Sequence, residues 1–263
     1  MQDVNLTIIQ PEIFWKDKTR NLEQFSEYFE RIGTTEIIVL PEMFSTGFIV
    51  DPRDVAEPPD GPTLEWMEFN SNSLDCIITG SIIVKEKDRY YNRLYWVEPD
   101  GNYHYYNKRH LFHMAGEHER FEQGKDKLIV KFKGWKFCPL ICYDLRFPVW
   151  IKNNYIDSEY DYDVLIFVAN WPKVRSLAWK SLLLARAIEN QAYVVGVNRV
   201  GKDGNGIEHS GDSAVISPHG RYLVSLKPGK QDFETIELSM EELTGFRNEF
   251  QVGRDWDKFQ ILD

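Results

Sequence analysis

Short apolar runs rich in β-branched residues recur along this 263-residue chain and outnumber the segments with helical periodicity. That ratio leaves too few helices to cover both faces of one doubly wound sheet. Two stacked sheets with helices packed outside each of them fit better, because every sheet must bury its faces. The expected strands are residues 4–9, 36–40, 76–84, 94–98, 128–132, 136–142, 164–169, 192–198, 214–217, 222–226 and 235–238, and the expected helices are residues 17–31, 63–72, 148–154, 176–190 and 240–246.

The sequence contains neither an internal repeat nor a Gly/Ser-rich or Pro-rich linker, so we read residues 1–263 as a single domain. A hydrophobic fraction of 43%, with 14% aromatic residues, is ample for a large core. No apolar segment approaches the length needed to span a bilayer, and the first residues lack the basic region and cleavage site of a signal peptide. We therefore expect no membrane contact and no signal peptide.

The net charge and the number of cysteines indicate which kinds of ligand and which cellular compartment to expect. The net charge is −10, from 31 basic and 41 acidic residues, which argues against binding nucleic acid or an anionic membrane. Small molecules are the favoured ligands. Three cysteines are too few, and odd in number, for a disulfide framework, so we expect a cytoplasmic protein.

Three polar residues stand at the ends of expected strands: Glu42 in IIVLPEM, Lys108 in YYNKRH and Cys142 in LICYDLR. The stretch FCPLICYDLRFP predicts a buried strand that stops at Cys142 and turns into a helix. Ligand sites in α/β folds gather where strands end, so the three side chains are candidates for one site. Each also has an ordinary reading, as a buried cysteine, a solvated turn glutamate and a surface lysine.

Two further patterns compete for function. Four histidines, His104, His110, His113 and His118, lie close together in sequence, but no paired H-x-x-x-H or C-x-x-C motif accompanies them. We therefore predict no metal site. The segment NRVGKDGNG lacks the Lys-Ser/Thr ending of a phosphate loop, and its Gly, Asn and Asp content predicts a turn-rich loop.

The three strand ends, taken in order, resemble the catalytic blocks of the nitrilase, or carbon-nitrogen hydrolase, superfamily. VLPEMFSTGF carries Glu42, YNKRHLF carries Lys108 and PLICYDLRFP carries Cys142, while GEHERFEQG matches the second acidic position with Glu117. The resemblance runs from about Leu6 to the tail. Within the superfamily the chain is most similar to omega-amidases, on HLFHMAGEHERF, NWPKVRSLAWKSLLLARAIENQAYVVGVNRVGKDGNG and HSGDSAVISPHG.

The resemblance implies a four-layer α-β-β-α sandwich of two mixed β-sheets flanked by helices. It also implies the chemistry: Cys142 is the nucleophile, Glu42 the base, and Lys108 with the Tyr143 backbone N–H the oxyanion donors. Glu117 would orient Lys108 or the substrate. The expected substrate is the omega-amide of a 2-oxo dicarboxylic acid, such as 2-oxoglutaramate or 2-oxosuccinamate, which is hydrolysed through a thioester.

Substrate-binding residues follow from the same resemblance. We expect Phe44 and Trp171 to wall the pocket, with Asn170 near the nucleophile. Arg175 is the candidate clamp for the substrate carboxylate, since a guanidinium suits a planar carboxylate. Arg146 is a second candidate, although we favour a structural ion pair for it.

The implied mechanism needs neither a metal nor an organic cofactor. The resemblance further implies a homodimer, and the C-terminal tail, about residues 247–263, is a candidate for its interface. FQVGRDWDKF departs from the family pattern around Gly253.

Two alternatives to an omega-amidase stay open at this point. One is another enzyme of the superfamily, namely an amidase, an N-carbamoyl hydrolase or a nitrilase. The other is a binding module without catalytic activity.

Overall fold

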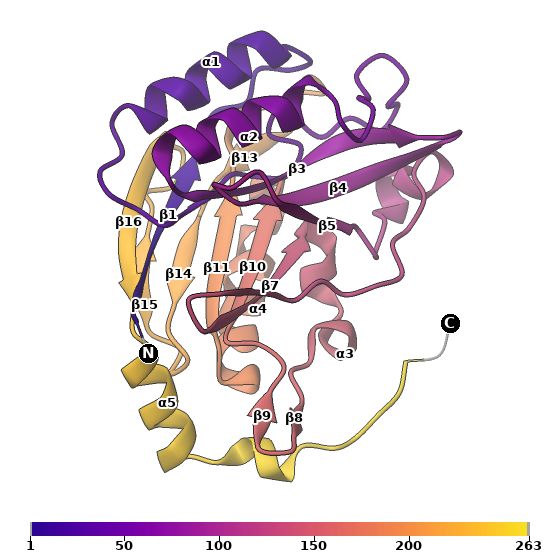
Figure 1. Cartoon of the computed structure of the whole chain (residues 1–263). Coiled ribbons are helices and arrows are strands. Elements are labelled where there is room, and N and C mark those ends of the chain that lie inside the picture. The colour runs from indigo at the N-terminus through magenta and orange to yellow at the C-terminus, as the bar shows by residue number, and fades with distance from the viewer. Residues whose placement is uncertain (1, 262–263) are drawn as a thin grey trace.

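In the computed structural model, which describes residues 2–261, two six-stranded mixed sheets pack face to face with helices outside them (Figure 1). The predicted layered fold is confirmed. The strands are β1 (Val4–Gln10), β2 (Ile37–Val39), β3 (Ile77–Glu86), β4 (Arg89–Val97), β5 (Tyr103–Asn107), β6 (Val130–Phe132), β7 (Trp135–Ile141), β8 (Tyr155–Ile156), β9 (Glu159–Tyr160), β10 (Val164–Ala169), β11 (Tyr193–Asn198), β12 (Val200–Lys202), β13 (Glu208–Ser210), β14 (Ala214–Ile216), β15 (Tyr222–Ser225) and β16 (Asp232–Leu238), and the helices are α1 (Lys18–Phe29), α2 (Pro62–Leu74), α3 (Pro148–Ile151), α4 (Ser176–Asn190) and α5 (Met240–Glu249).

The two sheets have the same plan, with parallel strands at the centre and antiparallel strands at the edges. The first has the order β16-β1-β2-β3-β4-β5, in which β2 runs parallel to both β1 and β3. The second has the order β15-β14-β11-β10-β7-β6, in which β10 runs parallel to both β7 and β11. The carboxyl ends of the central strands in each sheet therefore meet at one edge, where ligand sites are expected.

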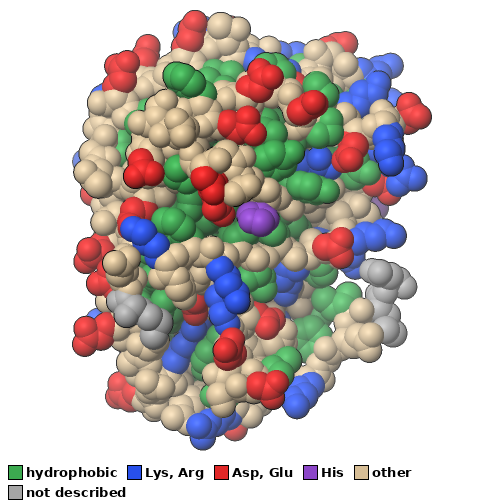
Figure 2. All heavy atoms as spheres, viewed as in Figure 1, with side chains coloured by type: hydrophobic (Ala, Val, Ile, Leu, Met, Phe, Trp, Pro, Cys, Tyr) green, Lys and Arg blue, Asp and Glu red, His purple; other side chains and the backbone are tan. Residues whose placement is uncertain are grey.

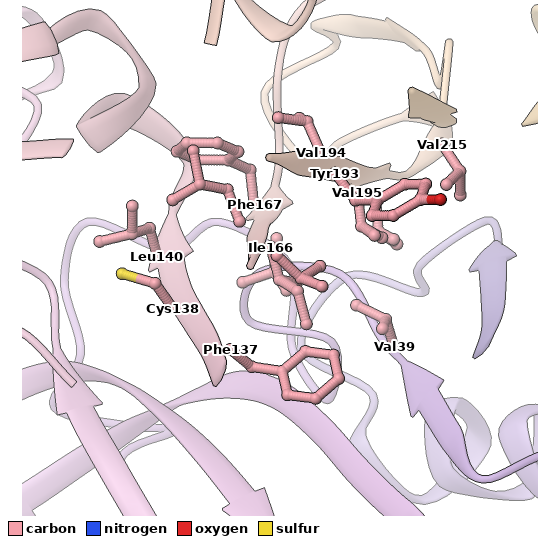
Figure 3. Packing of buried hydrophobic residues seen from close by; sticks show 14 of the residues in the cluster. Val39, Phe137, Cys138, Leu140, Ile166, Phe167, Tyr193, Val194, Val195 and Val215 are labelled. Atoms are coloured by element: carbon pink, nitrogen blue, oxygen red, sulfur yellow. The ribbon is translucent and has the colours of Figure 1, made fainter. Parts of the chain in front are cut away.

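The main core lies between the two sheets. Figure 3 shows Phe137, Ile166 and Val195 of the second sheet packing toward Val39 of the first. All six residues of β10, VLIFVA, are buried, as expected for a central strand covered on both faces. Full burial of one such side chain stabilises the fold by about 1.5–3 kcal/mol.

Helices cover the outer faces, as the amphipathic patterns predicted. On the first sheet, Phe25 of α1 packs edge-on against Phe44. On the second, α4 approaches β11 so closely that a Cβ at Gly196 would lie 2.5 Å from the Leu183 side chain. The absence of a side chain at Gly196 therefore permits the contact between helix and sheet.

All the expected strands and helices exist, with shifts at their ends, but several strands were missed. The expected helix 148–154 is only the short α3. The edge strand β5 is missed because its sequence, YHYYN, has largely exposed side chains and no apolar run. The segment predicted as a turn-rich loop, residues 198–206, does contain a turn after Lys202, but it also contains β12, which pairs with β13 beyond it.

Two features of the molecule concern its possible contacts with other molecules and with membranes. Acidic and basic side chains are interspersed over the face shown in Figure 2. Among residues 2–261, no helix combines the length and the apolar character needed to cross a membrane.

One glycine fixes where the segment after β5 lies. A Cβ at residue 124 would sit 2.0 Å from the Asn107 backbone oxygen, and the Gly124 N–H donates to the Lys108 carbonyl at 2.9 Å. Backbone cannot move aside as a side chain can. We predict that Gly124→Ala lowers the free energy of unfolding by about 1–3 kcal/mol, measured by urea denaturation.

The matched control is Gly33→Ala, because a Cβ there meets nothing within 4 Å. That variant should stay within about 1 kcal/mol of the wild type. Equal destabilisation by the two substitutions would contradict the steric explanation.

Candidate active site

Cys142 occupies the junction between β7 and a 3-10 helix, Cys142–Arg146, where the sequence predicted it. Its φ is +45°, a left-handed conformation that residues other than glycine adopt only with strain. The N–H groups in the first turn of a helix lack an acceptor inside that helix, so Tyr143 can offer its N–H to a ligand. The turn thus presents a thiol and a backbone donor together.

The buried side chain of Asp144 holds this turn in place. Its Oδ2 accepts hydrogen bonds from the Ile141 N–H at 3.0 Å and from the Tyr106 hydroxyl at 2.8 Å. Its Oδ1 accepts from the His110 N–H at 3.1 Å. Asp144 therefore ties the nucleophile turn to the segment that carries Lys108, a role that the sequence analysis missed.

Glu42 follows β2 and is fully buried. Its Oε1 accepts from Lys108 Nζ at 2.8 Å and from Asn92 Nδ2 at 2.8 Å. Its Oε2 accepts from the Asn170 N–H at 2.8 Å, and the Asn170 side chain donates to the Glu42 carbonyl. Because Asn170 follows β10, these bonds join the two sheets at the site.

Lys108 follows β5, and its ammonium group lies between two carboxylates. Nζ is 2.8 Å from Glu42 Oε1 and 3.0 Å from Glu117 Oε2. Burial alone would lower the pKa of Lys108, but Glu117 and Glu42 outweigh it and raise that pKa. The side chain therefore remains an ammonium ion at neutral pH.

Glu117 stands in the short 3-10 helix Glu117–Glu119, fully buried against Lys108. Its Oε2 also accepts from the Phe112 N–H at 2.6 Å. Burial raises the pKa of Glu117 and the charge of Glu42 adds to that effect, while Lys108 opposes both. The structure thus brings Glu117 together with the other predicted residues, in direct contact with Lys108.

Asn92, on β4, is a second buried residue that the sequence analysis missed. Its Nδ2 donates to Glu42 Oε1 at 2.8 Å and to Glu117 Oε1 at 3.3 Å. The only sequence signal was an amide within the largely apolar and aromatic run of a strand.

The Cys142 thiol is protonated in the resting site. Burial raises its pKa well above the ordinary value, and the charge of Glu42 with a hydrogen bond to that carboxylate raises it further, while Lys108 opposes both. A base must therefore take the proton during reaction, and the neighbouring Glu42 carboxylate is the candidate.

A cavity of about 580 Å³ opens onto Cys142 and Lys108. Aromatic side chains and two arginines form much of its wall. The Arg175 guanidinium lies 5.4 Å from the centre of the Phe112 ring, and that of Arg146 lies 4.8 Å from the centre of the Trp171 ring. The lining includes Trp15, Phe48, Phe112, Tyr143, Arg146, Asn170, Trp171, Arg175, Asn205, Ile207 and His209.

Two of our expectations for the pocket were wrong. Phe44 is not in the wall, because its ring packs in the outer core against Phe25 and Trp66, and Phe48 lines the cavity instead. Within the part of the chain that the structure describes, Arg146 faces the cavity and forms no ion pair with an acidic neighbour.

The histidines of the segment 104–118 do not converge. His110 Nδ1 pairs with Asp144 at 2.8 Å, and His113 stacks on His118 with ring centres 3.8 Å apart. Among residues 2–261, no three His, Cys, Asp or Glu side chains are arranged to hold a metal ion.

Comparisons with known proteins identify the family of the chain. The family model described as carbon-nitrogen hydrolase matches residues 5–248. The chain is 42% identical over 262 residues to omega-amidase YafV of Yersinia enterocolitica, covering all of both chains. It is 30% identical over 255 residues to the 2-oxoglutaramate amidase of Bacillus subtilis, covering 95% of this chain and 96% of the relative.

Among solved structures, the fold matches XC1258 from Xanthomonas campestris, described as a CN-hydrolase superfamily protein with an arsenic adduct in the active site. The TM-score is 0.97 at 40% identity, covering 99% of this chain and all of the other. The resemblance predicted from the sequence motifs is confirmed. The chain belongs to the carbon-nitrogen hydrolase family, and it is a hydrolase that acts on the carbon–nitrogen bonds of amides.

Proposed function

We propose that this protein is an omega-amidase that releases ammonia from 2-oxo dicarboxylic acid monoamides, such as 2-oxoglutaramate and 2-oxosuccinamate. The observation that carries the proposal is the contact of Glu42, Lys108 and Glu117 beside Cys142, at the base of a cavity that also presents arginines. The similarity to relatives named omega-amidase and 2-oxoglutaramate amidase supports the substrate class.

Glu42 acts as the base in the first half of the reaction. Its Oε1 already accepts two donors, whereas Oε2 accepts only the Asn170 N–H and keeps a lone pair to take the thiol proton. The sulfur of Cys142 then attacks the amide carbonyl carbon and forms a tetrahedral intermediate. Glu42 returns the proton to the nitrogen, the C–N bond breaks, and ammonia leaves a thioester on Cys142.

Lys108 and the Tyr143 N–H stabilise the oxyanion of the intermediate. An ammonium group has three donors, and Glu42 with Glu117 accept from Lys108, which leaves a donor for the substrate oxygen. A fixed donor of this kind contributes about 3–4 kcal/mol to the transition state. Glu117 holds Lys108 in position.

The second half of the reaction consumes water. Glu42 takes a proton from the water molecule, whose oxygen attacks the thioester carbonyl. The C–S bond breaks, the thiol is restored and the dicarboxylic acid departs. The net reaction converts one amide and one water into one carboxylic acid and one ammonia.

Three further proposals concern the context of the enzyme. We propose that residues 1–263 form one domain and that the protein works as a homodimer, with the tail 247–263 near the interface. We also propose a cytoplasmic location, supported by the three cysteines, which are all free thiols.

Replacing the nucleophile is expected to abolish turnover. Cys142→Ala should reduce ammonia release from 2-oxoglutaramate by at least about 10⁴-fold, because alanine cannot supply the attacking sulfur. Ammonia is measured beside glutamine, a carbamoyl amino acid and a simple nitrile. Turnover of one of those compounds alone would support the cysteine mechanism and reject the proposed substrate. If none of the compounds is turned over, the alternative of a binding module without catalytic activity is favoured.

The carboxylate clamp is tested by Arg175→Ala. We expect KM for 2-oxoglutaramate to rise about 10- to 100-fold, because a charge-assisted bond to the substrate is lost. KM for a neutral short-chain amide should change less than about 3-fold. The control is Arg221→Ala, an exposed arginine outside the cavity lining. Equal changes for both amides would remove Arg175 from the clamp.

Chelation provides a further test. Every proposed step uses side chains or backbone of this chain, so we expect the same rate of ammonia release before and after dialysis against EDTA. Loss of activity that added metal restores would contradict the mechanism.

A further inference from the structure

A single amide side chain lies between the two carboxylates of the site. Asn92 Nδ2 has two hydrogens, and its two acceptors are Glu42 Oε1 at 2.8 Å and Glu117 Oε1 at 3.3 Å. Asn92 is fully buried and does not line the cavity. It therefore contacts the carboxylates without contacting a ligand.

A chain of donors fixes which way the amide points. The Met43 N–H donates to Ser81 Oγ at 2.9 Å, so the Ser81 hydroxyl hydrogen is free for Asn92 Oδ1, 2.8 Å away. The amide nitrogen must then face the two carboxylates. A flipped amide would place its oxygen against two negative charges.

The chain of donors begins beside the base itself. Met43 directly follows Glu42 and has a φ of +44°, so the backbone at this point is held in an uncommon conformation. The Asn92 carbonyl also accepts from the Lys108 N–H at 2.9 Å. Asn92 thus contacts both carboxylates and the backbone of Lys108, and through Ser81 it is linked to the backbone of Met43.

We propose that Asn92 is a positioning residue of the reaction, which holds Glu42 and Glu117 as an oriented pair around Lys108, and that Ser81 sets its orientation. The inference rests on the proposed function, because it assumes that Glu42 is the base. Two buried carboxylates share one ammonium group, so a neutral donor between them reduces their repulsion without removing the net charge of the site.

The loss of this donor has a defined effect on protonation. A hydrogen bond to an ionised carboxylate favours the ionised form and lowers its pKa. Without Asn92, the ionised carboxylates lose a donor, and the acid limb of the reaction rate should move to higher pH than in the wild type. The observable is the acid midpoint of the reaction rate, which belongs to the coupled pair and not to either residue.

The test compares Asn92→Ala with the wild type in two assays. In ammonia release, kcat should fall about 10- to 100-fold, because bonds to charged groups are lost, while KM stays within about 3-fold since Asn92 does not line the cavity. In alkylation of Cys142 by iodoacetamide, the acid midpoint of the rate should move up by about one pH unit.

Two further variants distinguish a positioning role of Asn92 from an effect on the stability of the fold. Ser81→Ala keeps the Asn92 side chain but frees its orientation, so it should shift kcat and the acid midpoint in the same directions by less. Thr79→Val removes another buried hydroxyl from β3, which bonds to the Tyr95 carbonyl at 2.8 Å. It should lower the unfolding temperature without moving the acid midpoint. If Asn92→Ala does not fold, the kcat and the acid midpoint of Ser81→Ala test the proposal in its place.

The outcomes distinguish this inference from the proposed function. A wild type that releases no ammonia from any of the amides tested would reject the proposed function itself. Turnover of 2-oxoglutaramate by the wild type, with the same midpoint and kcat in Asn92→Ala and Ser81→Ala, would overturn the role of Asn92. A midpoint that Thr79→Val moves equally would also overturn it.

Discussion

The site depends on one buried ammonium group held between two buried carboxylates. Removal of three charges from water is unfavourable unless each is paired and hydrogen-bonded. Here Lys108 contacts both Glu42 and Glu117. Each carboxylate also accepts a hydrogen bond from a backbone N–H group, Glu42 from Asn170 and Glu117 from Phe112. These donors come from both sheets and from the segment after β5, so the cluster forms only when the whole sandwich has assembled.

The fold brings these groups together because parallel strands end at a common edge. Glu42 follows β2, Cys142 follows β7 and Asn170 follows β10, and the two sheets stack with those ends adjacent. Asp144 then links the turn after β7 to the segment with Lys108. The geometry of the site is thus set by strand order and by a few buried polar bonds, and the surrounding loops shape the cavity.

The sequence predicted the parts of the molecule that leave a strong local pattern. The alternation of apolar runs revealed the two sheets, and ordered motifs revealed Glu42, Lys108, Cys142 and Glu117. Phe44 was misplaced because it stands in the turn segment after β2, where no periodic pattern records which side chain faces the pocket.

The polar network was missed for a related reason. Asn92 and Asp144 act through contacts 50 and 34 residues away in sequence respectively, from Glu42 and from the His110 segment. Such partners become visible only when the strands are placed in space. The edge strand β5 and the hairpin β12–β13 escaped prediction because both are short and partly exposed, so neither needs an apolar run.

The central claim is that Cys142 carries the substrate as a thioester. The most direct measurement is mass spectrometry of the protein quenched with acid during turnover of 2-oxoglutaramate. We expect a 2-oxoglutaryl adduct on the peptide that contains Cys142, which disappears when the substrate is exhausted. Steady release of ammonia without an adduct, or with an adduct on another residue, would contradict it.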